Sequence, residues 1–295
     1  MKLFAGIDIG GTNIKYGVIS EDGNIIKSSE RSTEAHKGGM SIIDKVKEII
    51  SEMNKEYKIE GICVSTAGMV CPNEGKIVYA GPTIPNYTGV EIKKILEKEF
   101  NIKCEVENDV NCAALGELWL GAGKGKKSMA CMTIGTGIGG AIIVDGKIIH
   151  GFSNSAGEIG YMLVNGEQIQ NIASTTALVK NVAHRKGIDE NDINGKKIFK
   201  GYEDGDSICI DEIEKLADIL ALGISNTVYL FNPEVFVLGG GIMAREDILR
   251  PLIDKSLKKY LIESVYNNTN IAFAELRNTA GMMGAVYNYK VKELM

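Results

Sequence analysis

The feature that most constrains the fold is a pattern that occurs twice: a strand, a glycine-rich turn, a second strand, an Asp-Gly turn and a third strand. The first copy covers Ile7–Ile26, and the second begins with an apolar run at Met129–Ile134 that leads into GTGIGG at Gly135–Gly140. Self-similarity of this kind indicates an internal duplication. Two such halves facing each other would put both glycine turns on one cleft, where they could hold the phosphates of one nucleotide from both sides.

Between and after the two copies, apolar residues recur at helical spacing in segments that alternate with short apolar runs. This alternation predicts an α/β protein with mixed sheets flanked by helices. The expected helices are Ser41–Tyr57, Val90–Phe100, Val110–Leu120, Ser174–Arg185, Ile208–Phe231, a segment from about Arg245, and Thr279–Leu294, and the further strands are Ile59–Ser65, Ile102–Val106 and Glu234–Leu238.

Length and charge exclude several classes of protein. A chain of 295 residues is long enough for two cores. The net charge of −5 argues against binding to nucleic acid or to an anionic membrane, which needs a basic face. Apolar runs are too short to span a bilayer or to form a signal peptide. The six cysteines are scattered, with no C-x-x-C pair, so we expect reduced core residues in a cytoplasmic protein.

The first glycine turn, in IDIGGTNIKYG, has the composition of a phosphate-binding loop. Glycines let the backbone approach an anion and point N–H groups at it, and a second strand follows where a P-loop or dinucleotide fold would need a helix. Asp8 would repel a bare phosphate, so its position favours a divalent cation between the two. The alternative is an ordinary hairpin with a surface lysine. The residues involved are Asp8, Gly10, Gly11, Thr12, Asn13 and Lys15.

Two acidic segments are candidates for the chemistry. Glu107-Asn108-Asp109 lies where a strand passes into a helix, and Asp109 could accept a proton from a substrate hydroxyl. On the residues alone, Asn-Asp before a helix is first of all an N-cap, and capping is the favoured interpretation of Asn108 and Asp109. Glu158, in GFSNSAGEIGY, could bind a polyol or could be a solvated loop acid.

The motifs DIGGTNIKYG, STAG, ENDVNCAALGE, TIGTGIGGAIIVDGK, AGEIGY and FNPEVFVLGGG, in this order, closely resemble the ROK family of sugar kinases, in the actin, Hsp70 and hexokinase superfamily. The resemblance implies a two-lobed actin-like ATPase (ribonuclease H-like) fold, with lobes 1–112 and 113–278 and the final helix, 279–295, packing back on the first lobe. It implies ATP and Mg²⁺ as cofactors and transfer of the γ-phosphate to a hexose hydroxyl, usually the 6-OH. It also implies a homodimer, because dimers are common in the family, and the kinase branch, because no DNA-binding segment precedes the first strand.

The resemblance also implies roles for individual residues. Asp109 matches the catalytic base, Asn108 and Glu158 match ligands of sugar hydroxyls, and Gly68 matches a sugar-facing loop. The positions that match the nucleotide loops are Gly10–Thr12 and Thr136–Gly137 for the phosphates and Gly239, Gly240 and Gly241 for the adenosine.

One segment departs from the family pattern. Many ROK proteins follow A-G-E-x-G with a His and a cysteine-rich stretch that binds structural zinc, whereas here Tyr161 follows Gly160 and the cysteines are absent, so no zinc is expected. Gln170 takes the position of a sugar-binding Glu, for which Glu167 could compensate, and Thr83 stands where glucose-type members often have Asn. The zinc-free pattern resembles N-acetylmannosamine kinases most, with glucokinases and β-glucoside kinases as alternatives.

Two other classes remain open at this stage. A non-catalytic sugar-sensing protein would keep the sugar pocket without turnover. A protein ATPase of the actin or Hsp70 kind would need polymer contacts or a peptide-binding domain, and no added domain is visible.

Overall fold

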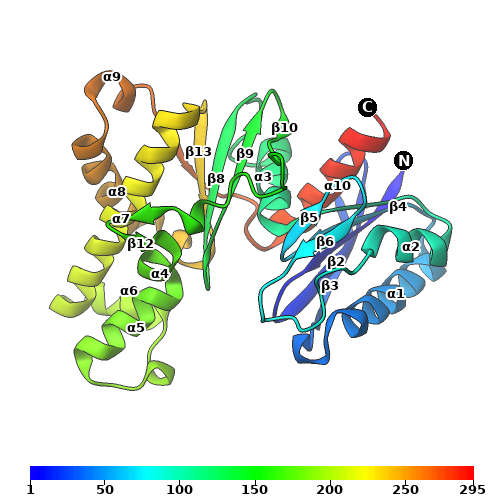
Figure 1. The fold of residues 1–295 in the computed structure, drawn as a ribbon, viewed down its shortest axis with the longest axis horizontal. Helices are drawn as coiled ribbons and strands as arrows, with labels where there is room; N and C mark the ends of the chain where they lie inside the picture. The colour runs from blue at the N-terminus through cyan, green and yellow to red at the C-terminus, as the bar shows by residue number, and fades with distance from the viewer. The chain divides into compact units, whose positions relative to one another are not determined.

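The computed structural model describes all residues from Met1 to Met295, and their contacts divide the chain into two compact units (Figure 1). The first unit contains residues 1–125, 150–156 and 276–295, and the second contains residues 126–149 and 157–275. The boundary expected at residue 112 lies inside helix α3 (Asp109–Leu120), all of which belongs to the first unit.

The first unit is built on a five-stranded sheet of order β3-β2-β1-β4-β7. Its strands are β1 (Leu3–Ile9), β2 (Asn13–Ser20), β3 (Ile25–Ser32), β4 (Ile59–Thr66) and β7 (Cys104–Asn108). The hairpin strands β1, β2 and β3 pair antiparallel, whereas β4 pairs parallel with both β1 and β7. Parallel pairing places the carboxyl ends of β1, β4 and β7 at one edge of the sheet.

Alternate side chains of β1 enter two different cores because successive residues of a strand point to opposite faces. Ala5, Ile7 and Ile9 pack with the apolar stripe of α1 (Gly39–Glu56) and with α2 (Ile92–Phe100). Phe4 packs on the other face with α10 (Ala280–Glu293) and α3. Figure 1 shows α1 and α2 on one side of the sheet and α10 on the other.

Helix α10 approaches α3 and β1 closely because small residues line the contact. An added Cβ at Gly284 would overlap the backbone carbonyl of Cys112, and one at Gly116 would lie 2.7 Å from the carbonyl oxygen of Ala280. Gly281 faces Asp8 in the same way. The side chains of this helix therefore have to be small where it crosses the end of β1 and the body of α3.

The second unit repeats the strand arrangement in the order β10-β9-β8-β13-β14. The strands are β8 (Met129–Ile134), β9 (Ile138–Val144), β10 (Lys147–Ile148), β13 (Val235–Gly239) and β14 (Ile271–Phe273). As in the first unit, the three hairpin strands pair antiparallel and the two following strands pair parallel. The predicted duplication is confirmed by this shared topology.

Helices complete the second unit, and the long α7 supplies the largest share of its core. The helices are α4 (Ile169–Ala173), α5 (Thr175–Lys186), α6 (Gly195–Glu203), α7 (Ser207–Phe231), α8 (Glu246–Tyr260) and α9 (Glu263–Tyr266). Helix α6 lies within the polar stretch 187–206 and buries Ile198 and Phe199. Two short hairpins, β5 (Met69–Cys71) with β6 (Lys76–Tyr79) and β11 (Leu163–Val164) with β12 (Glu167–Gln168), lie outside the two sheets.

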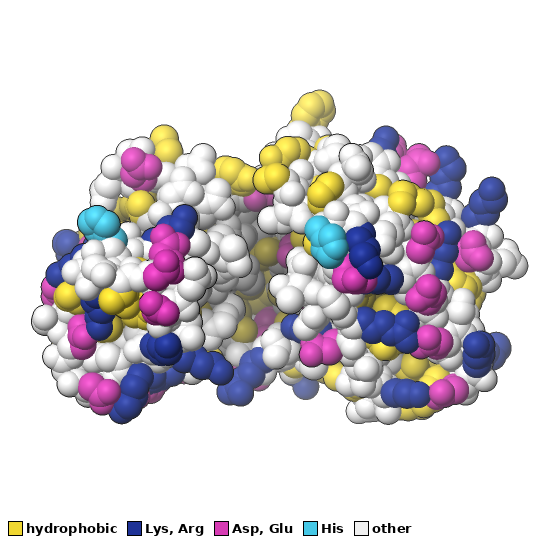
Figure 2. All heavy atoms as spheres, turned by 90° about the horizontal axis from the view of Figure 1, so that it is seen from below, with side chains coloured by type: hydrophobic (Ala, Val, Ile, Leu, Met, Phe, Trp, Pro, Cys, Tyr) yellow, Lys and Arg dark blue, Asp and Glu magenta, His cyan; other side chains and the backbone are white.

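Charged side chains of both signs are interspersed over the face of each unit that Figure 2 shows. Many charged side chains of the protein form exposed ion pairs, such as Lys27 with Glu56, whose contribution to stability is small. None of the helices has both the length and the apolar character that crossing a membrane requires.

Candidate active site

Polar side chains gather at the carboxyl ends of the three parallel strands of the first unit. The register aligns Asp8 with Ser65 and Ser65 with Glu107, and one step further it aligns Ile9, Thr66 and Asn108. Ends of adjacent parallel strands are the usual place for a site in an α/β sheet. The side chains of Asp8, Ser65 and Glu107 point to the face of the sheet that α3 and α10 cover.

Asp8 is a carboxylate held in a tight, largely desolvated position. Ser65 Oγ donates to Asp8 Oδ1 at 2.7 Å, and Lys15 is its cross-strand neighbour on β2. Burial raises the pKa of Asp8, while the Ser65 hydrogen bond and the charge of Lys15 act in the opposite direction. The Asp8 carboxylate is largely shielded from water, and its negative charge is not fully neutralised by neighbouring groups. It is therefore suited to binding a hydrated cation.

The first glycine turn is fixed by its own backbone and by Thr33. Gly10 N donates to the Asn13 carbonyl at 3.0 Å, Thr33 Oγ1 donates to the Gly10 carbonyl at 2.6 Å, and Thr33 N donates to the Thr12 carbonyl at 2.8 Å. Gly11 and Thr12 at the tip are exposed, and a Cβ on Gly11 would meet nothing. The turn is thus rigid at its base and open at its tip.

Lys15 lies beyond this turn on β2, where its ammonium group donates to Asn278 Oδ1 at 3.3 Å. This contact joins β2 to the segment that leads into α10. The phosphate-binding and surface roles of Lys15 both remain compatible with this exposed position.

The second glycine turn leads to the start of a helix. Thr175 N, the first residue of α5, donates to the Gly135 carbonyl at 2.9 Å, and Thr136 and Gly137 are exposed. Ser174 caps α5 by accepting from Ala177 N at 3.2 Å. The N-terminus of a twelve-residue helix therefore lies at this turn, where its dipole favours an anion.

The predicted adenosine loop packs against this second turn. Gly240 has φ of +104°, and a Cβ there would overlap the backbone of Ile134, the residue before Gly135. Only glycine fits such a position without strain. The structure thus brings Gly239–Gly241 and Thr136–Gly137 together within the second unit, with Gly241 open to solvent.

Asn108 is the N-cap of α3. Its Oδ1 accepts from Val110 N at 2.9 Å and from Asn111 N at 3.0 Å, while its Nδ2 donates to the Gly68 carbonyl and to Asp109 Oδ1, both at 3.0 Å. The capping alternative is confirmed for Asn108. Every hydrogen-bonding position of this amide therefore has a partner inside the protein.

Asp109 is the first residue of α3, directly after the cap. Its Oδ1 accepts from Val110 N at 2.9 Å as well as from Asn108. The helix dipole at this position stabilises the ionised carboxylate. Gly68, whose φ is +100°, supplies the carbonyl that completes this cluster of Gly68, Asn108 and Asp109.

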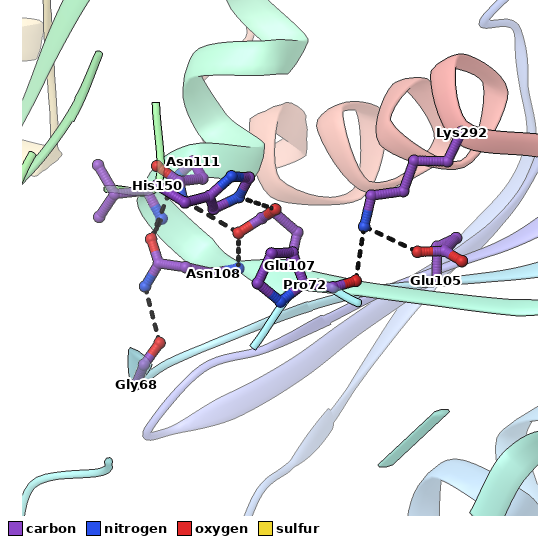
Figure 3. A network of polar contacts seen from close by, with 9 residues as sticks. Gly68, Pro72, Glu105, Glu107, Asn108, Asn111, His150 and Lys292 are labelled. Atoms are coloured by element: carbon purple, nitrogen blue, oxygen red, sulfur yellow. Dashed lines mark hydrogen bonds and ion pairs between the residues drawn. The ribbon is translucent and has the colours of Figure 1, made fainter. Parts of the chain in front are cut away.

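Glu107 and His150 form a pair that the sequence did not reveal (Figure 3). Glu107 is fully buried, and its Oε2 lies 2.7 Å from His150 Nε2. Glu107 Oε1 accepts from Asn108 N at 2.9 Å and from Asn111 Nδ2 at 3.0 Å. Burial raises the pKa of Glu107, but the hydrogen bond and charge of His150, with the two other donors, outweigh burial and leave this pKa below its usual value. The only sequence signal was a histidine at the end of a predicted strand.

The other predicted sugar ligands occupy distinct environments. Glu158 is half-buried, and its burial raises its pKa, whereas Tyr161 is 48% exposed. A Cβ on Gly137 or on Gly160 would lie 3.2 or 3.3 Å from Gln170 Oε1, so this amide lies against the second glycine turn. Glu167 is exposed on β12.

Thr83 lies on the exposed part of the loop between β6 and α2 in the first unit. The hydroxyl of the buried Tyr87 in the same loop lies 2.6 Å from Thr66 Oγ1. This contact fixes the loop at the carboxyl end of β4, beside the strand that leads into Asn108.

The comparison with family models decides the classification, because the ROK family model matches residues 4–291. The chain belongs to the ROK family. A β-glucoside kinase of Listeria monocytogenes is 35% identical over 304 residues, which cover 99% of both chains.

Solved ROK structures have the same fold along nearly the whole chain. A Listeria monocytogenes protein described as a candidate N-acetylmannosamine kinase has a TM-score of 0.88 at 31% identity and covers 99% of both chains. A ROK glucokinase of Streptomyces griseus, solved with glucose and AMPPNP, has a TM-score of 0.83 at 29% identity and covers 96% of this chain and 98% of its own. The predicted actin-like fold, with two mixed sheets flanked by helices, is confirmed.

Proposed function

We propose that this ROK protein is an ATP-dependent sugar kinase that transfers the γ-phosphate of ATP to a hexose hydroxyl, the 6-OH by family resemblance. The observation that carries the proposal is the match of the whole chain to ROK sugar kinases, one of them solved with a sugar and an ATP analogue. The first unit offers a carboxylate at a strand end and an open glycine turn, and the second unit offers another open glycine turn. Phosphoryl transfer depends mainly on positioning and on stabilisation of charge.

In the proposed mechanism Asp109 accepts the proton of the sugar hydroxyl as this oxygen attacks the γ-phosphorus, while the bond from this phosphorus to the oxygen that bridges it to the β-phosphate breaks and ADP leaves. The backbone N–H groups around Gly11 and Gly137 hold phosphate oxygens, and Gly239–Gly241 accommodate the adenosine. Asp8 is the residue that fits Mg²⁺, because Mg²⁺ prefers one carboxylate together with water and substrate phosphates. When bound, Mg²⁺ would neutralise negative charge on the phosphates.

For the substrate we propose N-acetylmannosamine, with glucose and β-glucosides as alternatives. The solved relative described as a candidate N-acetylmannosamine kinase supports this choice, while the β-glucoside kinase relative supports the alternative. Gln170 is an amide where a carboxylate would accept two hydroxyl protons, so it favours a sugar that also offers an acceptor, such as an acyl carbonyl. The cytoplasmic location and the homodimer stay predictions.

The test is an ADP-release assay with Mg²⁺ and ATP against glucose, N-acetylmannosamine, N-acetylglucosamine, mannose, allose, fructose and cellobiose. We expect sugar-dependent release of ADP, highest with N-acetylmannosamine. A higher kcat/KM for glucose or cellobiose would replace the substrate but keep the kinase. ADP release that no sugar accelerates, together with sugar binding by calorimetry, would mean that the protein is a non-catalytic sugar sensor.

A further inference from the structure

In the pair Glu107–His150, the glutamate lies two residues before Asp109 in the chain and is fully buried, whereas His150 is partly exposed. Strand β7 carries two buried glutamates on one face, Glu105 and Glu107, and Figure 3 shows that each has a lysine or histidine partner from a distant part of the sequence. Lys292 of α10 contacts Glu105 Oε2 at 2.9 Å, and His150 contacts Glu107 Oε2 at 2.7 Å. The two pairs differ in what else the glutamate holds.

Glu105 has only lysine partners, Lys93 and Lys292, and both lie away from α3. Glu107 instead uses its second oxygen to accept from Asn108 N and Asn111 Nδ2, which are the cap of α3 and a side chain of its first turn. The Glu107 carboxylate therefore contacts the start of α3 at two points. Asp109 and Val110 are the two residues between these anchor points.

His150 fixes that orientation. If the Glu107 carboxylate were held only through Oε1, by Asn108 and Asn111, it could rotate about its terminal torsion. A partner on Oε2 fixes the positions of both oxygens. His150 is also the first residue of the segment 150–156, which belongs to the first unit although its neighbours in sequence on both sides belong to the second. This segment leads directly to Gly157 and Glu158.

We propose that His150 is a positioning residue for phosphoryl transfer: through Glu107 it orients the first turn of α3 and with it the carboxylate of Asp109. This inference rests on the proposed kinase function.

The test compares two amides at position 150 in the ADP-release assay, with the sugar that the wild-type protein prefers. In His150→Gln the amide nitrogen occupies the place of Nε2 and can reach Glu107, whereas in His150→Asn it occupies the place of Nδ1 and cannot. We expect His150→Asn to lower kcat by about 10-fold or more, since misplacement by ~1 Å costs up to ~10²-fold, with KM for ATP nearly unchanged. We expect His150→Gln to recover most of the lost kcat.

Lys292→Met is the matched control, because it removes a lysine of α10 that contacts Glu105 of β7, while Lys93 still contacts Glu105. It should lower the free energy of unfolding and leave kcat unchanged. Any of three results would overturn the positioning role. His150→Asn could have the kcat of the wild type, the two amide variants could lose equal amounts of kcat, or Lys292→Met could lose as much kcat as His150→Asn. No sugar-dependent turnover in the wild type would overturn the kinase function itself, and the inference with it.

If His150→Asn does not fold, Glu107→Gln decides. Its amide oxygen can still accept from Asn108 and Asn111, but its amide nitrogen replaces the oxygen Oε2 that His150 Nε2 contacts in the wild type. We expect Glu107→Gln to lower kcat by about 10-fold, with KM for ATP nearly unchanged. A wild-type kcat in Glu107→Gln would overturn the inference.

Discussion

Gly281→Ala tests the role of Asp8 without removing or replacing any polar group of the site. Gly281 is in the first turn of α10, and a Cβ added there would lie 2.6 Å from Asp8 Cγ and 2.7 Å from both carboxylate oxygens. Carbon atoms in contact prefer about 3.5–4.0 Å, so the carboxylate has to move by about 1 Å. Ser65 Oγ, now 2.7 Å from Asp8 Oδ1, would then be near or beyond the limit of a hydrogen bond.

The cost of this movement can be worked out. Overpacking costs about 1–3 kcal/mol, and alanine is favoured over glycine inside a helix by about 0.5–1 kcal/mol. We therefore expect the free energy of unfolding to fall by no more than about 2 kcal/mol, which leaves the protein folded. The effect on catalysis is larger, because displacing a catalytic group by ~1 Å can cost ~10²-fold in rate. If Asp8 holds hydrated Mg²⁺, the Mg²⁺ concentration for half-maximal activity should also rise.

The assay is ADP release at saturating ATP and sugar with Mg²⁺ titrated, alongside urea unfolding of the same samples. Gly201→Ala is the matched control: it adds the same methyl group to α6 of the second unit, where the Cβ would lie 2.6 Å from Cys209 Sγ. The control should lose a similar amount of stability and keep its activity. Gly281→Ala with the kcat and Mg²⁺ requirement of the control would refute the role of Asp8.

Three further outcomes are expected. Asp109→Asn keeps the size of the side chain but removes the proton acceptor, so kcat in the ADP-release assay should fall by at least ~10²-fold, and nearly full turnover would remove Asp109 from the chemistry. Gly284→Ala would place a methyl group on the carbonyl of Cys112, and we expect urea unfolding to report a loss of about 3 kcal/mol or more; a wild-type unfolding midpoint would contradict the close contact of α10 with α3. The pKa of Glu107 is lowered in the folded protein, so its ionised form stabilises the fold above its unfolded pKa of about 4.3, and this stability is lost as pH falls through the folded value. Unfolding free energy measured between about pH 6 and 3 should therefore decline less in Glu107→Gln than in the wild type, and equal slopes would contradict the lowered pKa.

The sequence predicted those parts of the fold whose signal is local. The apolar runs of β1 and β4 and the helical spacing of Ile42, Ile43 and Val46 predicted their elements within a few residues. Helix α6 was not predicted, because its apolar face rests on Ile198 and Phe199 within a stretch rich in lysine, aspartate and glycine. Tertiary packing on α7 supplies the stabilisation that local propensity lacks.

For the site, the sequence and the resemblance proposed positions but not their contacts. The glycine turns and Asn108-Asp109 could be proposed because each is contiguous in the chain. Glu107 and His150 are 43 residues apart, and Gly281 lies far from Asp8 in sequence, so only the folded structure brings them together. The same holds for Gln170, whose approach to Gly137 depends on the packing of α4.

The position of α10 also affects how the chain folds as the ribosome makes it. Met282, Met283, Val286 and Tyr289 of α10 complete the core that covers Phe4, Ile19 and Cys63, on the face of the sheet where Asp8 lies. Translation produces these residues after the whole second unit has been synthesised. The nascent first unit can form the core shared with α1 and α2, but its other face stays uncovered until α10 leaves the ribosomal tunnel, so this face exposes apolar surface to which a chaperone can bind.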